Sequence, residues 1–594
     1  MNSKNNGLFK NSALIALTML LVFSFIACTK EGNVLEEPAG QLTEPTKAEA
    51  TKAPTLTDEP AATATPIVTE EVTPEPTATF EPPAEPVAVD DGRVKNIRVG
   101  FEQVYDSEWD YDNNEVLFYY QEDYPVLDEK DAVKYPELAE AFDEFQKAAY
   151  ASAKSVLSNL RECADVDKGE EYYYGPYFNS TKMLAVRTDS NLICLESNYE
   201  TYSGGIHGIY GTWGYCYDPS TGKTLAITDF IVDRNAFVEY VYNDLMTRND
   251  EDDYLLYDDM RQCVENYFDE NRLCFTVGYT GLTVVFNPYE ILPYAMGQTF
   301  IDIPFKGNET MFNSKYLDVP DNYMIPMNGN YTIRNDFGND GYIDTITVYK
   351  NYFNEMEEFN SLSFYLNELP VSKEFNTPET CYDTDIYYIH CNGEDLLYID
   401  YWFASEDDLT YVYKINMNSD GYEENAEENP YGTIDLVTDE MYMSFSGNYT
   451  YDPMNAVMYY RYDMIGTNFL KAHYAIGKDY LPVQLDLLPE FSYYFNLTAR
   501  QDIPMLKVNM EDTSSKPAVE VPYTVKSGSN LRMFRTDGKS FIDFLTEEGD
   551  DFAVRMYIEE LREEYPDLDY VFYDYVPLGY ESFDELFDNI IYAD

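Results

Sequence analysis

The chain has 594 residues, and its 108 acidic side chains against 39 Lys and Arg give a formal net charge of −69 at pH 7. A negative field of this size disfavours nucleic acids and anionic lipid surfaces as partners, and it favours cations and basic proteins. The 58 Tyr and 34 Phe are enough to bury sizeable cores, and a chain of this length is typical of two to four domains.

The N-terminal residues have the pattern of an export signal. A basic start precedes an uncharged run over residues 13–26, which is shorter than the about 20 residues that span a bilayer core. These features are typical of a signal peptide. The run ends in Phe-Ile-Ala-Cys, which resembles a bacterial lipobox, so we expect residues 1–28 to be a lipoprotein signal with Cys28 as the lipidated residue. The alternative is an ordinary secretory signal with an incidental Cys.

Residues 29–92 have a different composition from the rest of the chain. They are rich in Pro, Thr, Glu and Ala, as in TPEPTATFEPPAEP, and Phe80 is their only aromatic residue. Such a segment cannot bury enough apolar surface to offset its ordering entropy. We expect a disordered, semi-rigid stalk that presents folded domains on the outer face of the cell membrane, anchored by lipid. In that setting the acidic charge has an alternative explanation, because it also keeps an exported protein soluble.

Residues 93–308 predict a domain of mixed secondary structure. A strand is expected in VLFYYQEDYPVL, a helix from Pro136, a hairpin in LAVRTDSNLICLESNYETY and a second hairpin around DPSTGK. Asp233 is expected to cap a further helix, and two strands flank Thr280-Gly281. Because strands and helices do not alternate strictly, the pattern predicts an α+β domain.

Three sequence blocks carry a resemblance to a known family: YSGGIHG, YDPSTGKTLAITDFI and GLTVVFNPYEILPYAMGQTFIDIPF. Over about residues 95–308 the chain resembles the extracytoplasmic domain of RsiV-type anti-sigma factors, which also precedes the catalytic part of PdaC-type peptidoglycan deacetylases. The resemblance implies a ligand-binding domain outside the cell. In RsiV-type proteins this domain binds lysozyme, a strongly basic protein, and that triggers proteolytic signalling. We expect binding to carry over to this chain, but neither the signalling circuit nor a deacetylase activity.

The first block contains a histidine framed by glycines. Catalysis by His needs a positioned nucleophile, charged partner or metal, and the chain has only two other histidines and neither HExxH nor GxSxG. We therefore expect no catalytic residue here. The favoured interpretation is a structural turn in which the imidazole hydrogen-bonds backbone. A ligand-binding loop is the alternative, and its candidate binding residues are Gly204, Gly205, His207 and Trp213.

The run NYTIRNDFGNDGYIDTITVYKN holds the one cofactor signal in the sequence. Oxygen-bearing side chains alternate along it, and a Gly permits the sharp turn that a Ca²⁺ loop needs. The spacing lacks the final Glu of an EF-hand and resembles the calcium loops of VCBS and FG-GAP-type β repeats. The alternative is an Asp-Gly hairpin turn without metal. The candidate Ca²⁺ ligands are Asp336, Asp340, Tyr342 and Asp344.

The rest of the chain predicts a β-rich domain over residues 316–515 and a smaller one over 516–594. Tyr alternates with aliphatic residues in the first, which is typical of half-buried strands, although stacking of Tyr on sugars is an alternative. The second resembles an SH3-like barrel, and the stripe of Val554, Ile558 and Leu561 predicts a terminal helix. The expected fold class is an α+β N-terminal domain followed by a β-rich C-terminal region with terminal helices.

The cysteines beyond the lipobox are scattered, without a CxxC pair, which disfavours a zinc framework. Cys381 and Cys391 are close enough in sequence to suggest a bridge across a hairpin. Taken together, the sequence favours a surface-anchored bacterial lipoprotein without enzymatic activity. Its expected partner is a basic protein such as a lysozyme-type muramidase, or cell-wall glycan. The alternatives are a cell-wall polysaccharide-modifying enzyme and a structural lipoprotein without a ligand.

Overall fold

The structure is a computed structural model that describes residues 94–592, all within one compact unit. Gaps in this description lie at 111–114, 168–174, 249–254, 258, 328–330, 354–357, 372–380, 404–407, 419–430, 446–448, 493–495, 515, 517–520, 548 and 566–569. The expected lipoprotein signal at 1–28, with Cys28, and the expected stalk at 29–92 lie outside the described residues.

The expected fold class is wrong, because the chain is β-rich with several sheets and holds five α-helices among the described residues. The clearest error is at the C-terminus, where Gly549–Tyr565 is the strand β29 rather than a helix. Val554 and Ile558 are four residues apart, a spacing that fits a helical stripe and two periods of a strand equally well. Met556 is buried between them, which is the strand pattern.

The first sheet has six strands in sequence order, and its pairs are antiparallel except for β2 with β3. Parallel neighbours need a long crossover, which is supplied by α2 (Glu129–Lys134) and α3 (Pro136–Asp167). The helix begins at Pro136, as predicted. The strands are β1 (Val99–Asp110), β2 (Glu115–Leu127), β3 (Tyr177–Thr188), β4 (Ile193–Tyr202), β5 (Ile209–Asp218) and β6 (Lys223–Thr224).

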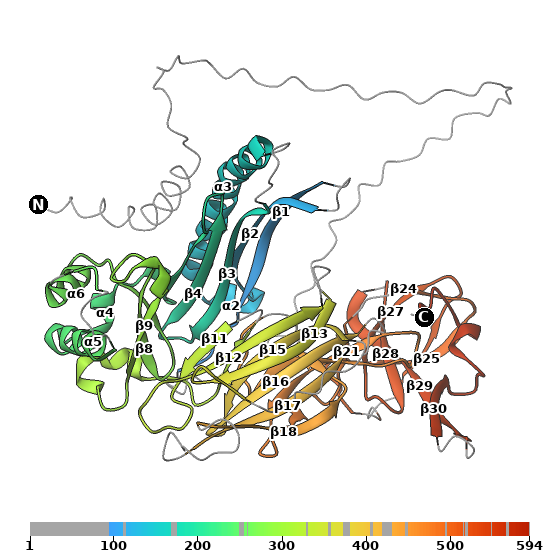
Figure 1. Cartoon of the computed structure of the whole chain (residues 1–594). Helices are drawn as coiled ribbons and strands as arrows, with labels where there is room; N and C mark the ends of the chain where they lie inside the picture. The colour runs from blue at the N-terminus through green and yellow to red at the C-terminus, as the bar shows by residue number, and fades with distance from the viewer. Residues whose placement is uncertain are drawn as a thin grey trace, which may run out of the picture. The chain divides into compact units, whose positions relative to one another are not determined.

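Helix α3 lies along one face of this sheet (Figure 1). Its N-terminal half places Leu138 and Phe142 in one apolar cluster with Ile193. Its C-terminal half buries Val156 and Leu160 in a second cluster, against aromatic residues of β2 and β3. Each fully buried aliphatic side chain of this kind contributes about 1.5–3 kcal/mol, so the helix fixes one face of the sheet.

A smaller three-stranded sheet follows, made of β7 (Cys274–Val277), β8 (Gly281–Phe286) and β9 (Thr299–Pro304). It shares a core with α4 (Ile227–Phe230), α5 (Arg234–Arg248) and α6 (Met260–Asp269). Asp233 caps α5 as predicted, because its Oδ1 accepts hydrogen bonds from the backbone N–H groups of Asn235 and Ala236. The 3₁₀ turns η2 (Tyr294–Met296), η3 (Glu309–Met311) and η4 (Ser314–Leu317) complete this region.

Two further sheets pack through a shared core. The five-stranded sheet has β10 (Tyr323–Pro326), β15 (Cys381–Cys391), β16 (Glu394–Phe403), β17 (Leu409–Met417) and β18 (Gly432–Met441). The four-stranded sheet has β11 (Tyr331–Asn335), β12 (Asp344–Phe353), β13 (Glu358–Leu366) and β14 (Leu369–Pro370). Both faces of β15 and β16 are buried, in two different clusters, which explains why these strands read as nearly continuous apolar and Tyr-rich runs.

The last sheet has thirteen strands that run from residue 444 to residue 588. Strands on the two sides of residue 515 pair with one another, since β25 pairs with both β26 and β29. A 3₁₀ turn, η6 (Phe583–Glu585), precedes the final strand. The strands are β19 (Ser444–Phe445), β20 (Ala456–Arg461), β21 (Phe469–Ile476), β22 (Pro482–Gln484), β23 (Glu490–Phe491), β24 (Asn496–Ala499), β25 (Ile503–Val508), β26 (Val521–Val525), β27 (Asn530–Thr536), β28 (Phe541–Thr546), β29, β30 (Tyr570–Pro577) and β31 (Phe587–Asp588).

The suggested bridge between two cysteines is tested by simple geometry. Cys381 and Cys391 stand at opposite ends of the single strand β15, about 33 Å apart at 3.3 Å per residue, so the suggested bridge between them is wrong. Of the helices in the described part of the chain, none is long and apolar enough to cross a membrane.

Candidate functional site

The glycine-framed histidine lies in the loop between β4 and β5. Gly204 and Gly205 have φ angles of +103° and +102°, a backbone region that glycine adopts without steric penalty. Gly208 is held close to β4, because a Cβ there would lie 2.8 Å from the carbonyl oxygen of Thr201. The glycines therefore shape a tight loop that carries the next two side chains outward.

His207 makes the backbone hydrogen bond expected of a structural turn, and its ring is exposed. Its Nδ1 lies 2.8 Å from the carbonyl oxygen of Gly208. A carbonyl oxygen only accepts, so Nδ1 carries a proton. In the neutral tautomer this leaves Nε2 as a hydrogen-bond acceptor. The partner that fixes this ring is a backbone carbonyl rather than a carboxylate or a nucleophile.

Tyr294, in η2, is the centre of an aromatic group around this histidine. The His207 and Tyr294 rings stack with centroids 3.9 Å apart at 20°, and the Tyr294 hydroxyl donates to the carbonyl oxygen of Gly208 at 2.8 Å. Tyr210 and Tyr289 also contact Tyr294, at centroid distances of 5.6 and 5.5 Å. We call the following residues the aromatic surface: Ile206, His207, Tyr210, Tyr289, Tyr294 and Met296.

Much of this surface is apolar and open to solvent. Ile206 is fully exposed at the loop tip, Tyr289 is 60% exposed and Met296 is 49% exposed. Large apolar side chains that gather at one place on a soluble protein mark interaction sites more often than scattered ones do. The group is also rigid for an exposed site, because ring stacking and the Tyr294 hydroxyl join two loops.

The turn that carries Tyr289 is fixed to β5 by an amide side chain. Asn287 Oδ1 accepts from the backbone N–H of Thr212 at 2.8 Å, and its Nδ2 donates to the Thr212 carbonyl oxygen at 3.1 Å. This pairing needs the close approach of Gly211, where a Cβ would lie 2.7 Å from Asn287 Oδ1. Glu290 completes the turn by accepting from the backbone N–H of Asn287 at 2.7 Å. Burial raises the pKa of Glu290.

Trp213 does not belong to the aromatic surface. It stacks on Tyr199 with ring centroids 6.5 Å apart. It also lies three residues from Tyr210 on β5, so the two side chains project from opposite faces of the strand. Of the four candidate binding residues, Gly204, Gly205 and His207 share the loop, and Trp213 lies apart from it. Sequence reasoning missed Tyr289, Tyr294 and Met296, whose only signal was the block NPYEILPYAMG.

The candidate calcium residues lie at the turn between β11 and β12. Asp336 accepts from the backbone N–H groups of Asp340 and Gly341, and Asp340 accepts from that of Tyr342. Tyr342 is 73% exposed. Burial, together with the charges of Asp340 and Asp336, raises the pKa of Asp344 to about 6. No group of three or more His, Cys, Asp or Glu side chains in the described ranges has the geometry to hold a metal ion. Calcium binding stays a prediction.

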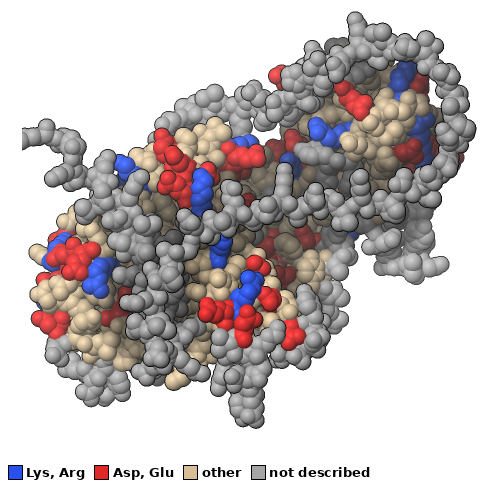
Figure 2. Space-filling view, turned by 90° about the horizontal axis from the view of Figure 1, so that it is seen from above, with Lys and Arg blue, Asp and Glu red and all other residues tan. Residues whose placement is uncertain are grey.

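On the face of the molecule seen in Figure 2, acidic side chains occur in several groups with Lys and Arg between them. No single acidic patch on that face accounts for the net charge of −69. A charged partner would therefore be attracted by the summed field of the molecule, and contacts at a defined surface would decide its position.

Comparison with known proteins identifies one domain. Residues 228–306, from within α4 to beyond β9, match the family described as protein of unknown function DUF3298. The chain therefore contains a DUF3298 domain, which includes Tyr289, Tyr294 and Met296 of the aromatic surface. No curated protein matches the chain.

Two solved structures of DUF3298 proteins are similar to part of the chain. One, from Bacteroides fragilis, is 21% identical and covers 37% of this chain and 96% of its own, with a TM-score of 0.27. The other, from Pseudomonas aeruginosa, is 11% identical and covers 38% of this chain and 99% of its own, with a TM-score of 0.25.

Proposed function

We propose that this protein is an exported, lipid-anchored binding protein, and that its aromatic surface binds a basic protein outside the cell. The observation that carries the proposal is the rigid, exposed group around the His207–Tyr294 stack, built jointly by the β4–β5 loop and the DUF3298 domain. The resemblance of three sequence blocks in this region to RsiV-type domains favours a muramidase of the lysozyme type as the partner. Export and lipidation at Cys28 are part of the same proposal.

The chemistry of the surface favours a protein partner. Aromatic side chains and Met are enriched in the buried centres of protein interfaces, where they supply large contact area at low entropic cost. Ile206 is fully exposed at the loop tip, directly after Gly204 and Gly205, so its side chain is free to contact a partner. A net charge of −69 speeds association with a cationic protein and makes that association sensitive to salt.

The test is a titration of the full chain with lysozyme at two salt concentrations. We expect saturable binding that weakens as salt rises. Tyr289→Ala and Ile206→Asp are each expected to weaken it by about tenfold or more, the effect of losing an interface anchor of about 1.4 kcal/mol or more. Tyr342→Ala is the matched control, since Tyr342 is an exposed tyrosine outside the aromatic surface. This variant should bind lysozyme with the affinity of the wild type.

Purified peptidoglycan is titrated in parallel. The proposal is supported if the wild type binds lysozyme and the Tyr289→Ala and Ile206→Asp variants do not. Retention by peptidoglycan without lysozyme binding would contradict it and would favour a glycan ligand. Turnover of peptidoglycan would favour the enzyme alternative. If Tyr342→Ala weakens lysozyme binding as strongly as Tyr289→Ala and Ile206→Asp do, the aromatic surface is not the binding site.

A further inference from the structure

Two cysteines lie directly opposite each other in the first sheet. Cys194 of β4 pairs with Cys216 of β5 in the antiparallel register, and their Sγ atoms lie 3.2 Å apart. Opposite residues in antiparallel strands have Cα atoms about 4.5–5.5 Å apart, which lies within the about 4.4–6.8 Å that a disulfide spans. The backbone therefore holds these two side chains at a separation that a disulfide can bridge.

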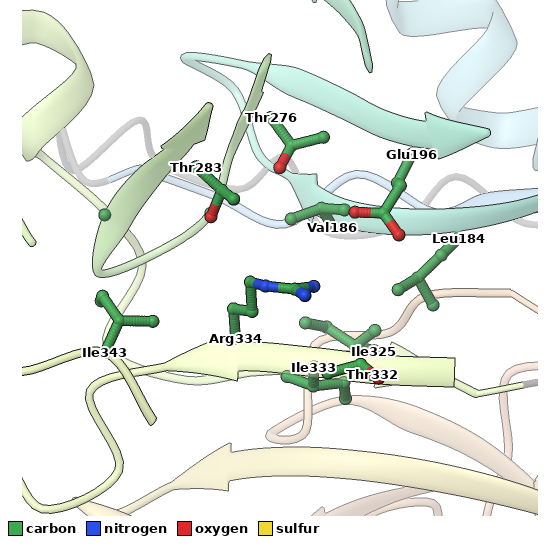
Figure 3. A pocket seen from close by; sticks show the side chains of 12 residues that line it. Leu184, Val186, Glu196, Thr276, Thr283, Ile325, Thr332, Ile333, Arg334 and Ile343 are labelled. Atoms are coloured by element: carbon green, nitrogen blue, oxygen red, sulfur yellow. The ribbon is translucent and has the colours of Figure 1, made fainter. Parts of the chain in front are cut away.

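Both thiols are enclosed between two sheets. Cys194 is fully buried and Cys216 is 3% exposed, in the apolar cluster that joins β4 and β5 to the three-stranded sheet. The backbone N–H of Val277 in β7 donates to Cys194 Sγ at 3.1 Å. Close to this contact, Glu196 of β4 and Thr276 of β7 line one small cavity (Figure 3). The packing of β7 on β4 therefore fixes Cys194 and shields it from solvent.

The other cysteines of this region are placed differently. Cys274 Sγ donates to the carbonyl oxygen of Thr212 at 3.1 Å. Thr212 lies four positions before Cys216 on β5 (216 minus 212), about 13 Å away at 3.3 Å per residue. Cys263 lies in α6 and contacts no cysteine sulfur within the described residues. The geometry therefore singles out one pair of thiols.

We propose that Cys194 and Cys216 form a disulfide bond that joins the two strands carrying the β4–β5 loop. The reaction is thiol–disulfide exchange: one thiolate attacks the disulfide of an oxidant, and the second displaces the oxidant's sulfur as the new S–S bond forms. The two cysteines lose two electrons and two protons, and the oxidant is reduced from a disulfide to two thiols. In the cell the oxidant would be a protein disulfide outside the membrane, so the reaction there rests on the proposed export.

Burial determines when this bond forms. It raises the pKa of the Cys216 thiol well above its ordinary value, so the thiolate that exchange requires is scarce in the folded chain. Oxidation therefore belongs to folding, before the three-stranded sheet covers the thiols. The closed ring contains Ile206 and His207 of the aromatic surface, and it stabilises the folded chain by restricting the unfolded one.

Peptide mapping of the full chain after oxidation tests this proposal. Chain purified under reducing conditions is equilibrated with oxidised and reduced glutathione, in urea just below the unfolding midpoint so that buried strands can open. The remaining thiols are alkylated in denaturant before proteolysis and mass spectrometry. Because the oxidant is added, the result depends neither on export nor on lysozyme binding.

We expect the peptides of Cys194 and Cys216 to be recovered as one linked species, and Cys263 to be recovered alkylated. Recovery of Cys194 or Cys216 as an alkylated thiol, as a mixed disulfide with glutathione or linked to Cys274 would overturn the proposal. If the two cysteines link in glutathione but the chain is isolated reduced from the cytosol, the proposed export is wrong and the pairing stands.

The melting temperature gives a second readout. The oxidised wild type is expected to melt about 2–4 °C higher than the reduced chain. Cys194→Ser and Cys216→Ser should each abolish both the linked peptide and this shift, whereas Cys263→Ser is the control and should keep both. Equal melting temperatures of oxidised and reduced wild type would overturn the stabilising role. If a variant fails to fold by circular dichroism, the peptide map of the wild type decides alone.

Discussion

At the residue scale, Asp400 shows how burial sets a protonation state. It is 1% exposed in β16, and its Oδ1 lies 2.5 Å from Thr410 Oγ1. The same hydroxyl also contacts the carbonyl oxygen of Met443. The Thr410 hydroxyl donates to Asp400 Oδ1, and the backbone N–H of Phe445 donates to Oδ2 at 3.0 Å. Burial outweighs these two hydrogen bonds and raises the pKa of Asp400 to about 8, which favours the neutral carboxylic acid near pH 7.

The pH dependence of stability tests this assignment. Burial raises the pKa of Asp400 from 3.8 to about 8, so between these values the folded chain binds a proton that the unfolded chain releases. The free energy of unfolding should therefore fall as pH rises from about 4 to about 8, by about 6 kcal/mol at most from this group. The measurement is denaturant unfolding at pH 5 and pH 9.

Asp400→Asn should remove most of that dependence. The amide does not ionise, its oxygen can still accept from the backbone N–H of Phe445, and its NH₂ can donate to Thr410. Asp435→Asn is the matched control, since Asp435 is an exposed carboxylate in the same sheet, and it should keep the wild-type profile. An unchanged profile in the Asp400→Asn variant would show that Asp400 is not the group responsible.

At the element scale, the sequence predicted elements well where local signals agreed. The helix from Pro136, the β3–β4 hairpin with its turn near Asp189 and the capped helix α5 all form as expected. Prediction failed where one spacing fitted two structures, as in β29. Prediction from the sequence also missed part of the aromatic surface, because the His207–Tyr294 stack joins side chains 87 positions apart in the chain (294 minus 207). No local pattern encodes that contact.

The predicted calcium site belongs to one element of the fold, the turn between β11 and β12. Asp336, Asp340 and Asp344 bring three carboxylates to one short turn, and a bound cation would relieve their mutual repulsion. If calcium binds, it should raise the melting temperature, and Asp340→Ala should abolish that rise. The measurement is thermal unfolding with and without CaCl₂, with MgCl₂ as the control for general charge screening. If the melting temperature shifts equally in both salts, or in neither, the turn does not bind calcium specifically.

At the scale of the whole molecule, buried polar contacts join segments far apart in sequence. Arg187 is fully buried, pairs with Asp189 at 2.7 Å and donates to the carbonyl oxygens of Tyr316 and Asp318. Thr450 bonds to the backbone of Val99 and to the Thr188 hydroxyl. The N-terminal sheet is therefore tied both to the segment after the DUF3298 domain and to the C-terminal region.

Arg187→Met tests this coupling. It leaves Asp189 as an unpaired buried charge, which is expected to lower the free energy of unfolding by about 3–5 kcal/mol. Because the contacts cross between regions, we expect unfolding probes in both halves of the chain to shift together. Arg272→Gln, at an exposed ion pair, should change stability by less than about 1 kcal/mol. A shift confined to the N-terminal half would show that the two halves unfold independently.

The most direct test of the central claim is hydrogen exchange of the full chain with and without bound lysozyme. The account predicts slowed exchange at residues 203–211 and 288–298, which carry the aromatic surface, and unchanged exchange at the β11–β12 turn over 336–344. Protection elsewhere with none at the two aromatic loops would contradict it.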